Sequence, residues 1–305
     1  MEKFEINILG CGAAVPTGRH MTTAQLVNIH EKLFLVDCGE GTQTQIWKSG
    51  IRITNMDHIF ISHAHGDHFF GLVPLVSSLS LMLDRTKDLH LWIPESLEEP
   101  LESDFKQYCS LPFKLIFHPI DATKQGILYE DKEIMIETIP LIHGIPCCGF
   151  LFSEKPKLPV LLPEKCLSYG IPPHEFGKIK SGADWILHDG TVVPNSELTT
   201  PSDFVPRRYA FCSDTAYNPQ MIKQIHGVDL LYHEATFMAE EESLAATAGH
   251  STTAQAAMIA REAKVGKLAI GHYSIRYTIE TELLAEAQAI FPNTVATQEG
   301  LTISL

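Results

Sequence analysis

Four side chains that commonly bind metal ions lie within six residues of one another. Segment 63–68 reads HAHGDH, so it contains three imidazoles and one carboxylate, and it directly follows a short apolar run. Neutral imidazole and carboxylate are ligands that zinc and similar divalent ions accept. In an extended chain His63 and His65 point to the same side, whereas Asp67 and His68 lie beyond the next turn and can address a second position. Chance clusters of surface histidines also occur, but this spacing after an apolar strand predicts two adjacent metal ions.

Three more candidate ligands, His143, Asp214 and His272, each follow an apolar run of the chain. Taken singly, a polar residue in this position is more often a cap or a buried side chain with a satisfied hydrogen bond. Together with segment 63–68 they make a set of seven, in which Asp214 can bridge two ions because its carboxylate has two oxygens. The set does not identify the metal, since Zn²⁺, Mn²⁺ and Fe²⁺ can all use His and Asp ligands.

The elements that must position these residues are strands with helices between them in both halves of the chain. The apolar runs predict strands at 4–8, 33–36, 58–62, 89–93, 114–118, 133–139, 208–213, 228–232 and 267–271. Helices are expected at 42–50, 67–82, 97–108, 252–264 and 280–290, and a pair of strands at 294–297 and 301–304. Two facing sheets with helices on their outer sides fit this order, and no linker or tandem repeat divides it.

The overall charge limits the classes of partner. The 305 residues carry a formal net charge of −14, and so acidic a protein is a poor general binder of nucleic acid or of anionic membranes. Any nucleic-acid contact must therefore come from a local patch. No apolar run is long enough to span a membrane, and the first residues lack the basic and apolar parts of a signal peptide. Seven dispersed cysteines without a C-x-x-C pair are typical of reduced thiols, so we expect a cytoplasmic protein.

One segment differs from the rest of the chain. Residues 153–206 contain eight prolines and little hydrophobic periodicity, and within 154–182 five lysines stand against three glutamates. A solvated surface loop would explain this composition. A loop of this length within a compact domain is usually either disordered or functional, so the segment is a candidate for binding.

The H-x-H-x-D-H segment and the later His, Asp and His after strands resemble those of metallo-β-lactamase-fold hydrolases. Four more stretches are similar to the ribonuclease Z family, endonucleases that trim the 3′ end of precursor tRNA. They are 171–182, 213–215 (SDT), 233–237 (HEATF) and 250–252 (HST). This resemblance runs over essentially the whole chain. It implies an α+β fold, a four-layer αβ/βα sandwich, built as a single domain 1–305 with an inserted flexible arm at 153–182.

The resemblance also implies a role for each site residue. Glu234 and His250 would form the acid that protonates the leaving group, and Asp67 would orient the attacking water or take its proton. On spacing alone, Glu234 is better explained as a turn cap, and His250 as a surface histidine beside a helix N-cap at Ser251 or Thr252. The joint match to the family reverses this preference. The chemistry supports the acid, because the leaving 3′-oxygen of a ribose needs a proton that a histidine beside a carboxylate can give. The implied zinc ligands are His63, His65 and His143 for one Zn²⁺, Asp67, His68 and His272 for the other, and Asp214 between them.

In the family the arm binds tRNA, so here Lys178 and Lys180 would contact its phosphates, and Arg19 near the N-terminus is a further candidate. Two stretches depart from the family pattern. His174-Glu175 follows Pro172-Pro173 where Gly-Pro is usual, and residues 16–21 (PTGRHM) lack the Lys and Asn of the P-x-K-x-R-N loop. Rejection of tRNAs that already carry CCA is therefore not implied. Family members are homodimers, so we expect a homodimer that acts on precursor tRNA and has no membrane partner.

Two other classes of function remain open at this point. A small-molecule metallohydrolase of the same fold, such as a phosphodiesterase, arylsulfatase or lactonase, suits the acidic charge but does not require the Glu234–His250 pair. A metal-stabilised RNA-binding or scaffold protein would need neither the pair nor a complete ligand set. The first alternative predicts turnover of small esters without affinity for tRNA.

Overall fold

Two compact units make up the described part of the chain. The computed structural model describes residues 2–82 and 85–305. The first unit consists of the residues up to Glu130, Ile134–Ser153 and Arg207–Leu305, and the second consists of Asp131–Glu133 and Glu154–Pro206. Among the described residues no helix combines the length and the apolar character that crossing a membrane requires. All seven candidate metal ligands belong to the first unit.

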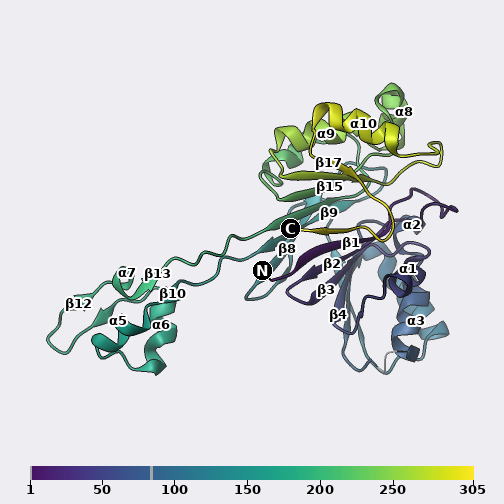
Figure 1. The fold of residues 1–305 in the computed structure, drawn as a ribbon. Coiled ribbons are helices and arrows are strands. Elements are labelled where there is room, and N and C mark those ends of the chain that lie inside the picture. Colours follow the sequence, from purple (N-terminus) through teal and green to yellow (C-terminus); the bar gives the residue numbers. More distant parts are fainter. Residues whose placement is uncertain (1, 83–84) are drawn as a thin grey trace. The chain divides into compact units, whose positions relative to one another are not determined.

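The first sheet of this unit has the strand order β18-β1-β2-β3-β4-β5-β6. Strands β18 to β3 pair antiparallel and strands β3 to β6 run parallel. Helices α1 (Thr42–Ser49), α3 (Leu72–Met82) and α4 (Glu98–Tyr108) share an apolar core with one face of the sheet, and Figure 1 shows α1 and α3 on its outer side. The strands are β1 (Phe4–Gly10), β2 (Ala24–Ile29), β3 (Lys32–Val36), β4 (Met56–Phe60), β5 (Leu89–Pro94), β6 (Leu115–Ile120) and β18 (Thr302–Ser304).

The second sheet has the order β17-β16-β15-β14-β9-β8-β7. Strands β14 to β17 run parallel, and β9 pairs antiparallel with β14. Helices α9 (Thr253–Glu262) and α10 (Thr281–Ile290) cover its outer side (Figure 1). The strands are β7 (Ile127–Glu130), β8 (Ile134–Pro140), β9 (Cys148–Glu154), β14 (Arg208–Cys212), β15 (Leu230–Glu234), β16 (Lys267–Gly271) and β17 (Thr294–Ala296).

The two sheets pack face to face around aromatic side chains. The ring of Phe60 on β4 lies 5.5 Å from that of Phe150 on β9, and Phe34 on β3 lies 6.0 Å from Phe152 on β9, measured between ring centroids. Burial of such large apolar surfaces between two sheets is the main stabilising contribution that this architecture offers. With helices outside both sheets, the order of layers is αβ/βα, as expected.

The expected pairing of the two closing strands is wrong. Strand β17 pairs with β16 of the second sheet, whereas β18 pairs with β1 of the first sheet. The segment between them crosses from one sheet to the other, and Thr297 donates its N–H to Ile270 O while Leu301 O accepts from Ile8 N. The short segment between the two strands would suit a hairpin. Instead, β17 and β18 satisfy the backbone groups of β16 and β1, which would otherwise lack a partner at the border of each sheet.

Strands β2, β7 and β9 were not predicted, and the helix expected at 67–82 is divided. Every residue of β2 and of β9 is buried, so neither strand shows the alternation that marks a half-exposed strand. The helix divides into α2 (Gly66–Phe69) and α3 because Gly71 N donates to Cys38 O. A Cβ at Gly71 would lie 2.2 Å from Gly39 O, so this close approach requires glycine.

The second unit has a small core of its own. Cys166, Ile171, Ile179, Val193 and Leu198 are buried together. The expected arm, 153–182, covers the first part of this unit, whereas Val193 and Leu198 come from the part that follows. Glu154–Pro206 as a whole holds five lysines and seven acidic residues, so the positive charge of 154–182 does not extend over the whole unit. Its elements are β10 (Val160–Leu161), α5 (Pro163–Ser168), η2 (Pro173–Glu175), α6 (Phe176–Lys180), β11 (Trp185–Ile186), β12 (Val192–Val193), α7 (Asn195–Leu198) and β13 (Thr199–Thr200).

Candidate metal centre

The seven candidate ligands form two adjoining groups. Within each group the potential ligand atoms all lie within 4.8 Å of one another. The residues come from segments that follow β4, β8, β14 and β16 and from the short helix α2. The fold therefore brings together side chains that are up to 209 residues apart in the sequence, His63 and His272. The first group is His63, His65, His143 and Asp214, and the second is Asp67, His68 and His272.

The first group surrounds a position that we call position A. His65 Nδ1 lies 3.0 Å from His63 Nε2 and 3.2 Å from His143 Nε2. Asp214 Oδ2 lies 3.6 Å from His63 Nε2 and 3.8 Å from His143 Nε2. Neighbouring ligands of a tetrahedral zinc ion, with bonds of about 2.1 Å, stand about 3.4 Å apart. The four ligand atoms therefore have the spacing of one such coordination shell.

The second group and the other oxygen of Asp214 surround position B. Asp214 Oδ1 lies 3.3 Å from His68 Nε2 and 3.2 Å from His272 Nε2. Asp67 Oδ2 lies 3.6 and 3.7 Å from the same two nitrogens. Both Nε2 atoms are buried and have no hydrogen-bond partner among the described residues. Buried polar atoms are seldom left unpaired, so a divalent ion fits this position, and Asp214 directs one oxygen to each of the two positions.

Asp214 and His63 have charge states that suit metal binding, whereas the charges of Asp214 and Asp37 raise the pKa of His68 against the effect of its burial. Burial alone would raise the pKa of Asp214, but the charges of the surrounding histidines, His272 first, hold it well below its usual range. Burial lowers the pKa of His63 well below that of free histidine, so its imidazole is neutral and has a lone pair to share.

The Nδ1 atoms of four of these histidines bond to a second layer of residues. Such partners fix the tautomer and the ring orientation, so that each Nε2 is free to bind an ion. His65 is the exception, because it presents Nδ1. The four contacts are His63 to Ser62 Oγ (2.9 Å), His68 to Asp37 Oδ2 (2.7 Å), His143 to Gly249 O (2.8 Å) and His272 to Thr236 Oγ1 (2.8 Å).

Asp37 and Gly249 are residues whose part in the site the sequence did not reveal. Asp37 is fully buried, and its carboxylate accepts hydrogen bonds from Ser62 N at 2.7 Å and Ser62 Oγ at 2.9 Å. The signal for it was present, since an aspartate directly follows the apolar run of β3. Gly249 has a φ of +74°, and a Cβ there would lie 3.0 Å from His143 Nδ1. Only glycine accepts both conditions without strain.

Glu234 and His250 form a close pair beside the two positions. His250 Nδ1 lies 2.9 Å from Glu234 Oε1, and the His250 ring lies 5.1 Å from that of His143 and 5.2 Å from that of His272. Burial would lower the pKa of His250, but the hydrogen bond and the charge of Glu234 raise it to about 9. A protonated histidine at this place can donate a proton.

Glu234 also fastens the backbone around the site. Its fully buried carboxylate accepts from the N–H groups of Thr215 at 3.1 Å, Thr236 at 3.0 Å and Ser251 at 2.9 Å. The explanation as a cap and the explanation as a catalytic carboxylate are therefore compatible. The expected N-cap is Thr252, whose side chain forms a capping box with Gln255 at the start of α9.

The three expected substrate-binding residues lie outside this cluster. The Arg19 guanidinium donates to the carbonyl oxygens of Tyr277 and Thr278 and pairs with Glu280 at 2.6 Å. Lys178 pairs with Glu175 at 2.8 Å, and Lys180 lies on α6. Because the Arg19 guanidinium is engaged within the protein, it holds the segment around 277–280 against the N-terminal loop.

A pocket of about 270 Å³ opens at the metal positions. Asp67, His250 and His272 line it, together with Ala14 and Ile275. The Ala14 N–H donates to Asp67 Oδ2 at 2.8 Å and so orients this carboxylate. A substrate group that enters the pocket would meet both metal positions and the acid pair.

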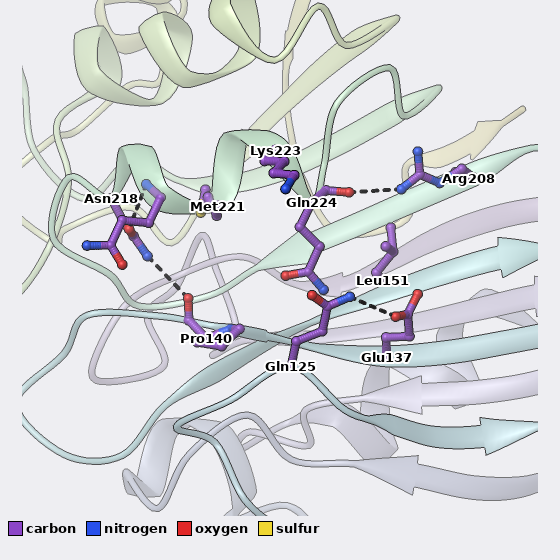
Figure 2. Close-up of a pocket in the computed structure, with 10 residues that line it drawn as sticks. Gln125, Glu137, Pro140, Leu151, Arg208, Asn218, Met221, Lys223 and Gln224 are labelled. Carbon is purple, nitrogen blue, oxygen red and sulfur yellow. Dashed lines mark hydrogen bonds between the residues drawn. The ribbon is translucent and has the colours of Figure 1, made fainter.

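A larger cleft, of about 480 Å³, lies elsewhere on the first unit (Figure 2). Side chains of β8, β9 and β14 and of the 3₁₀ helix η3 (Pro219–Lys223) line it, among them Glu137, Leu151 and Arg208. The Arg208 guanidinium donates to the backbone oxygen of Gln224, as Figure 2 shows. None of the seven candidate ligands lines this cleft, so cleft size does not mark the site of the chemistry.

Comparison with known proteins agrees with this geometry. A ribonuclease Z of Bacteroides fragilis is 50% identical over 306 residues, and the match covers 100% of both chains. A crystal structure of the short form of human tRNase Z superposes with a TM-score of 0.71 at 23% identity, covering 98% of each chain. The metallo-β-lactamase-fold protein YhfI of Bacillus subtilis superposes with a TM-score of 0.70 at 18% identity, covering 99% of this chain and 100% of that one.

Two facing sheets with a His/Asp cluster beyond the ends of their strands define a metal-dependent hydrolase of the metallo-β-lactamase fold. The chain belongs to the ribonuclease Z family, with which it aligns from end to end, and its residues 4–200 match the family model described as anti-Pycsar protein Apyc1, to which it also belongs. That model ends before Asp214, Glu234, His250 and His272, whereas the ribonuclease Z relative covers them.

Proposed function

We propose that the protein hydrolyses the phosphodiester bond that joins the 3′ end of tRNA to its trailer in a precursor, leaving a 3′-hydroxyl on the tRNA. The observation that carries this proposal is the Glu234–His250 pair, 2.9 Å apart, beside two positions that share Asp214. Hydrolysis of a lactam or a lactone does not require such a pair. A ribose 3′-oxygen leaves as a poor alkoxide unless it is protonated.

Two Zn²⁺ ions are the proposed cofactors. His63, His65 and His143 would hold one, Asp67, His68 and His272 the other, and Asp214 would bridge them. Bound there, the ions would supply positive charge to the phosphoryl oxygens and lower the pKa of a water to about 7. The donor set, the spacing of the ligand atoms and the two unpaired Nε2 atoms at position B support this proposal.

The chain's own residues would handle the protons. Asp67 lines the pocket, and its Oδ2 is held by the Ala14 N–H, so its carboxylate is placed to orient an attacking water or to take its proton. His250 would give a proton to the leaving oxygen, and Glu234 would hold its ring and favour the protonated form. Acid and base would thus act within one pocket.

The second unit is the proposed tRNA-binding arm. Five lysines between Glu154 and Lys180 would contact phosphates. The seven acidic residues of Glu154–Pro206 count against a uniform positive surface, so this binding would depend on the lysines of the first part. The family also implies a homodimer in which the arm of one subunit presents tRNA to the other.

The direct test is cleavage of a precursor tRNA with a 3′ trailer, mapped at nucleotide resolution, in the presence of zinc or manganese. A single cut next to the discriminator base would support the proposal. The acidic second unit favours a second candidate, a small-molecule phosphodiesterase. No cleavage of RNA, together with turnover of a simple phosphodiester by the same preparation, would favour that candidate.

A further inference from the structure

Thr236 occupies the point at which the acid pair and the metal positions meet. It lies two residues beyond the end of β15, and 4% of its surface is exposed. Its hydroxyl oxygen lies 2.8 Å from Glu234 Oε2 and 2.8 Å from His272 Nδ1. The same oxygen lies 3.4 Å from His250 Nδ1, at the limit of a hydrogen bond.

The number of protons available determines the direction of these hydrogen bonds. A threonine hydroxyl has one proton to donate and lone pairs with which to accept. The ionised carboxylate of Glu234 only accepts, so the hydroxyl donates to Glu234. The hydroxyl must then accept from His272, which places the imidazole proton of His272 on Nδ1.

This arrangement leaves His272 Nε2 without a proton. That atom is buried, has no hydrogen-bond partner among the described residues, and lies 3.2 Å from Asp214 Oδ1. A bare Nε2 is the form of histidine that binds a metal ion. The chain of bonds runs from His250 through Glu234 and Thr236 to His272.

We propose that Thr236 is a positioning residue whose hydroxyl holds His272 in its metal-binding tautomer and joins this ligand to the Glu234–His250 pair. The proposal deepens the proposed function, because it rests on the same ligand set. The ionised carboxylate of Glu234 orients the Thr236 hydroxyl, and the oriented hydroxyl fixes the tautomer of His272. Thr236 therefore acts through its neighbours, Glu234 and His272.

The test compares Thr236→Val, which keeps the shape and removes the hydroxyl, with Thr236→Ser, which keeps the hydroxyl. The first readout is the affinity for zinc, measured by competition with a chromogenic chelator and independent of any substrate. Loss of an outer partner of a metal-binding histidine typically costs 10–100-fold in metal affinity. We expect a loss of this size for Thr236→Val at one of the two ions and near-parent affinity for Thr236→Ser.

A matched control is Thr138→Val. Thr138 is also buried, and its hydroxyl bridges two groups, since it accepts from Gly126 N at 2.8 Å and donates to Lys124 O at 2.8 Å. It contacts none of the candidate ligands. We expect this variant to lose some thermal stability and to keep its zinc affinity.

Cleavage of precursor tRNA gives the second readout. In zinc-saturated Thr236→Val we expect kcat to fall while KM stays near that of the parent, because the contact positions catalytic groups and not the substrate. Unchanged zinc affinity in Thr236→Val, or failure of Thr236→Ser to restore it, would overturn the proposal. If Thr236→Val does not fold, the tautomer of His272 is measured from the ¹⁵N chemical shifts of its ring in zinc-loaded Thr236→Ser. A proton on Nδ1 is expected, and a proton on Nε2 would contradict the assigned tautomer. If the parent protein cleaves no precursor tRNA while Thr236→Val still loses zinc affinity, the proposed function fails and this inference stands.

Discussion

Replacing His250 by alanine should remove the proton donor and leave the metal positions intact. The change deletes an imidazole whose Nδ1 lies 2.9 Å from Glu234 Oε1. Glu234 keeps its hydrogen bonds from the N–H groups of Thr215, Thr236 and Ser251, so its buried carboxylate remains satisfied and the fold should survive. A positioned general acid contributes typically 10²–10⁴-fold to a rate. We therefore expect kcat on precursor tRNA to fall by about 10²–10⁴-fold, which is about 3–5 kcal/mol of barrier.

The assay should compare two substrates that differ in their leaving group. The 3′-oxygen of a ribose needs a proton, whereas p-nitrophenolate leaves without one at neutral pH. His250→Ala should therefore be far slower on precursor tRNA and close to the parent on bis(p-nitrophenyl) phosphate. His226→Ala is a suitable control, because this histidine is exposed and its backbone oxygen accepts from Arg208, while its ring has no hydrogen bond to the described residues.

Two results would refute the assignment. Equal loss on both substrates would mean that His250 does not act on the leaving group. Loss of an ion from His250→Ala would mean that His250 is a metal ligand. The geometry allows this alternative, because a ring nitrogen of His250 lies within 4.8 Å of the ligand atoms of Asp214 and His272. Metal analysis of the purified variant separates the two results.

Four further predictions concern the bridge, the second unit, Arg19 and the pH dependence of stability. Asp214→Ala should lose both ions, because each of its oxygens faces one position; two ions per chain in the purified variant would contradict the bridge. An Asn-Gly turn in place of residues 155–206 should leave the first unit folded, because Ser153 and Arg208 are already paired on antiparallel strands. We expect this variant to cleave precursor tRNA more weakly and bis(p-nitrophenyl) phosphate as well as the parent does, and equal loss on both would mean that the second unit is structural. Arg19→Ala should impair both substrates alike, because its guanidinium holds the segment around Tyr277 and Thr278; a loss confined to tRNA would instead indicate a phosphate contact. Burial lowers the pKa of His58 to about 4, so the folded protein resists a proton that the unfolded chain takes up near pH 6.5, and stability should fall as the pH drops between these two values. In His58→Gln, which keeps an acceptor for Trp92 Nε1, the fall in the free energy of unfolding on acidification should be smaller by up to about 3 kcal/mol. The same pH dependence in urea unfolding of the metal-free parent and variant would contradict the assignment.

The clustering of four ligand-type residues in segment 63–68, and the position of His143, Asp214 and His272 after apolar runs, were enough to select all seven candidate ligands. This worked because neighbouring strands that end on the same side of a sheet place the side chains that follow them close together. In addition, only a few residue types can serve as metal ligands. The HEATF and HST stretches likewise marked Glu234 and His250 before their distance was known. Their roles as ligands and acid stay predictions.

Other features depended on contacts that no local pattern encodes. Strands β2 and β9 are buried on both faces, so the usual alternation is absent. Strands β17 and β18 are close in sequence, yet each completes the edge of a different sheet. Arg19 has the charge of a phosphate ligand, but its guanidinium is bonded to carbonyl groups more than two hundred residues away.

By itself, the sequence determined the fold class, the family and the identity of the residues that can bind metal. Only the tertiary structure decided which nitrogen of each histidine faces a candidate metal position, that Asp214 directs one oxygen to each position, and that Thr236 lies between Glu234 and His272. The physical reason is that residue type and strand pattern are local properties, whereas the direction of a hydrogen bond depends on the partner that folding brings to it.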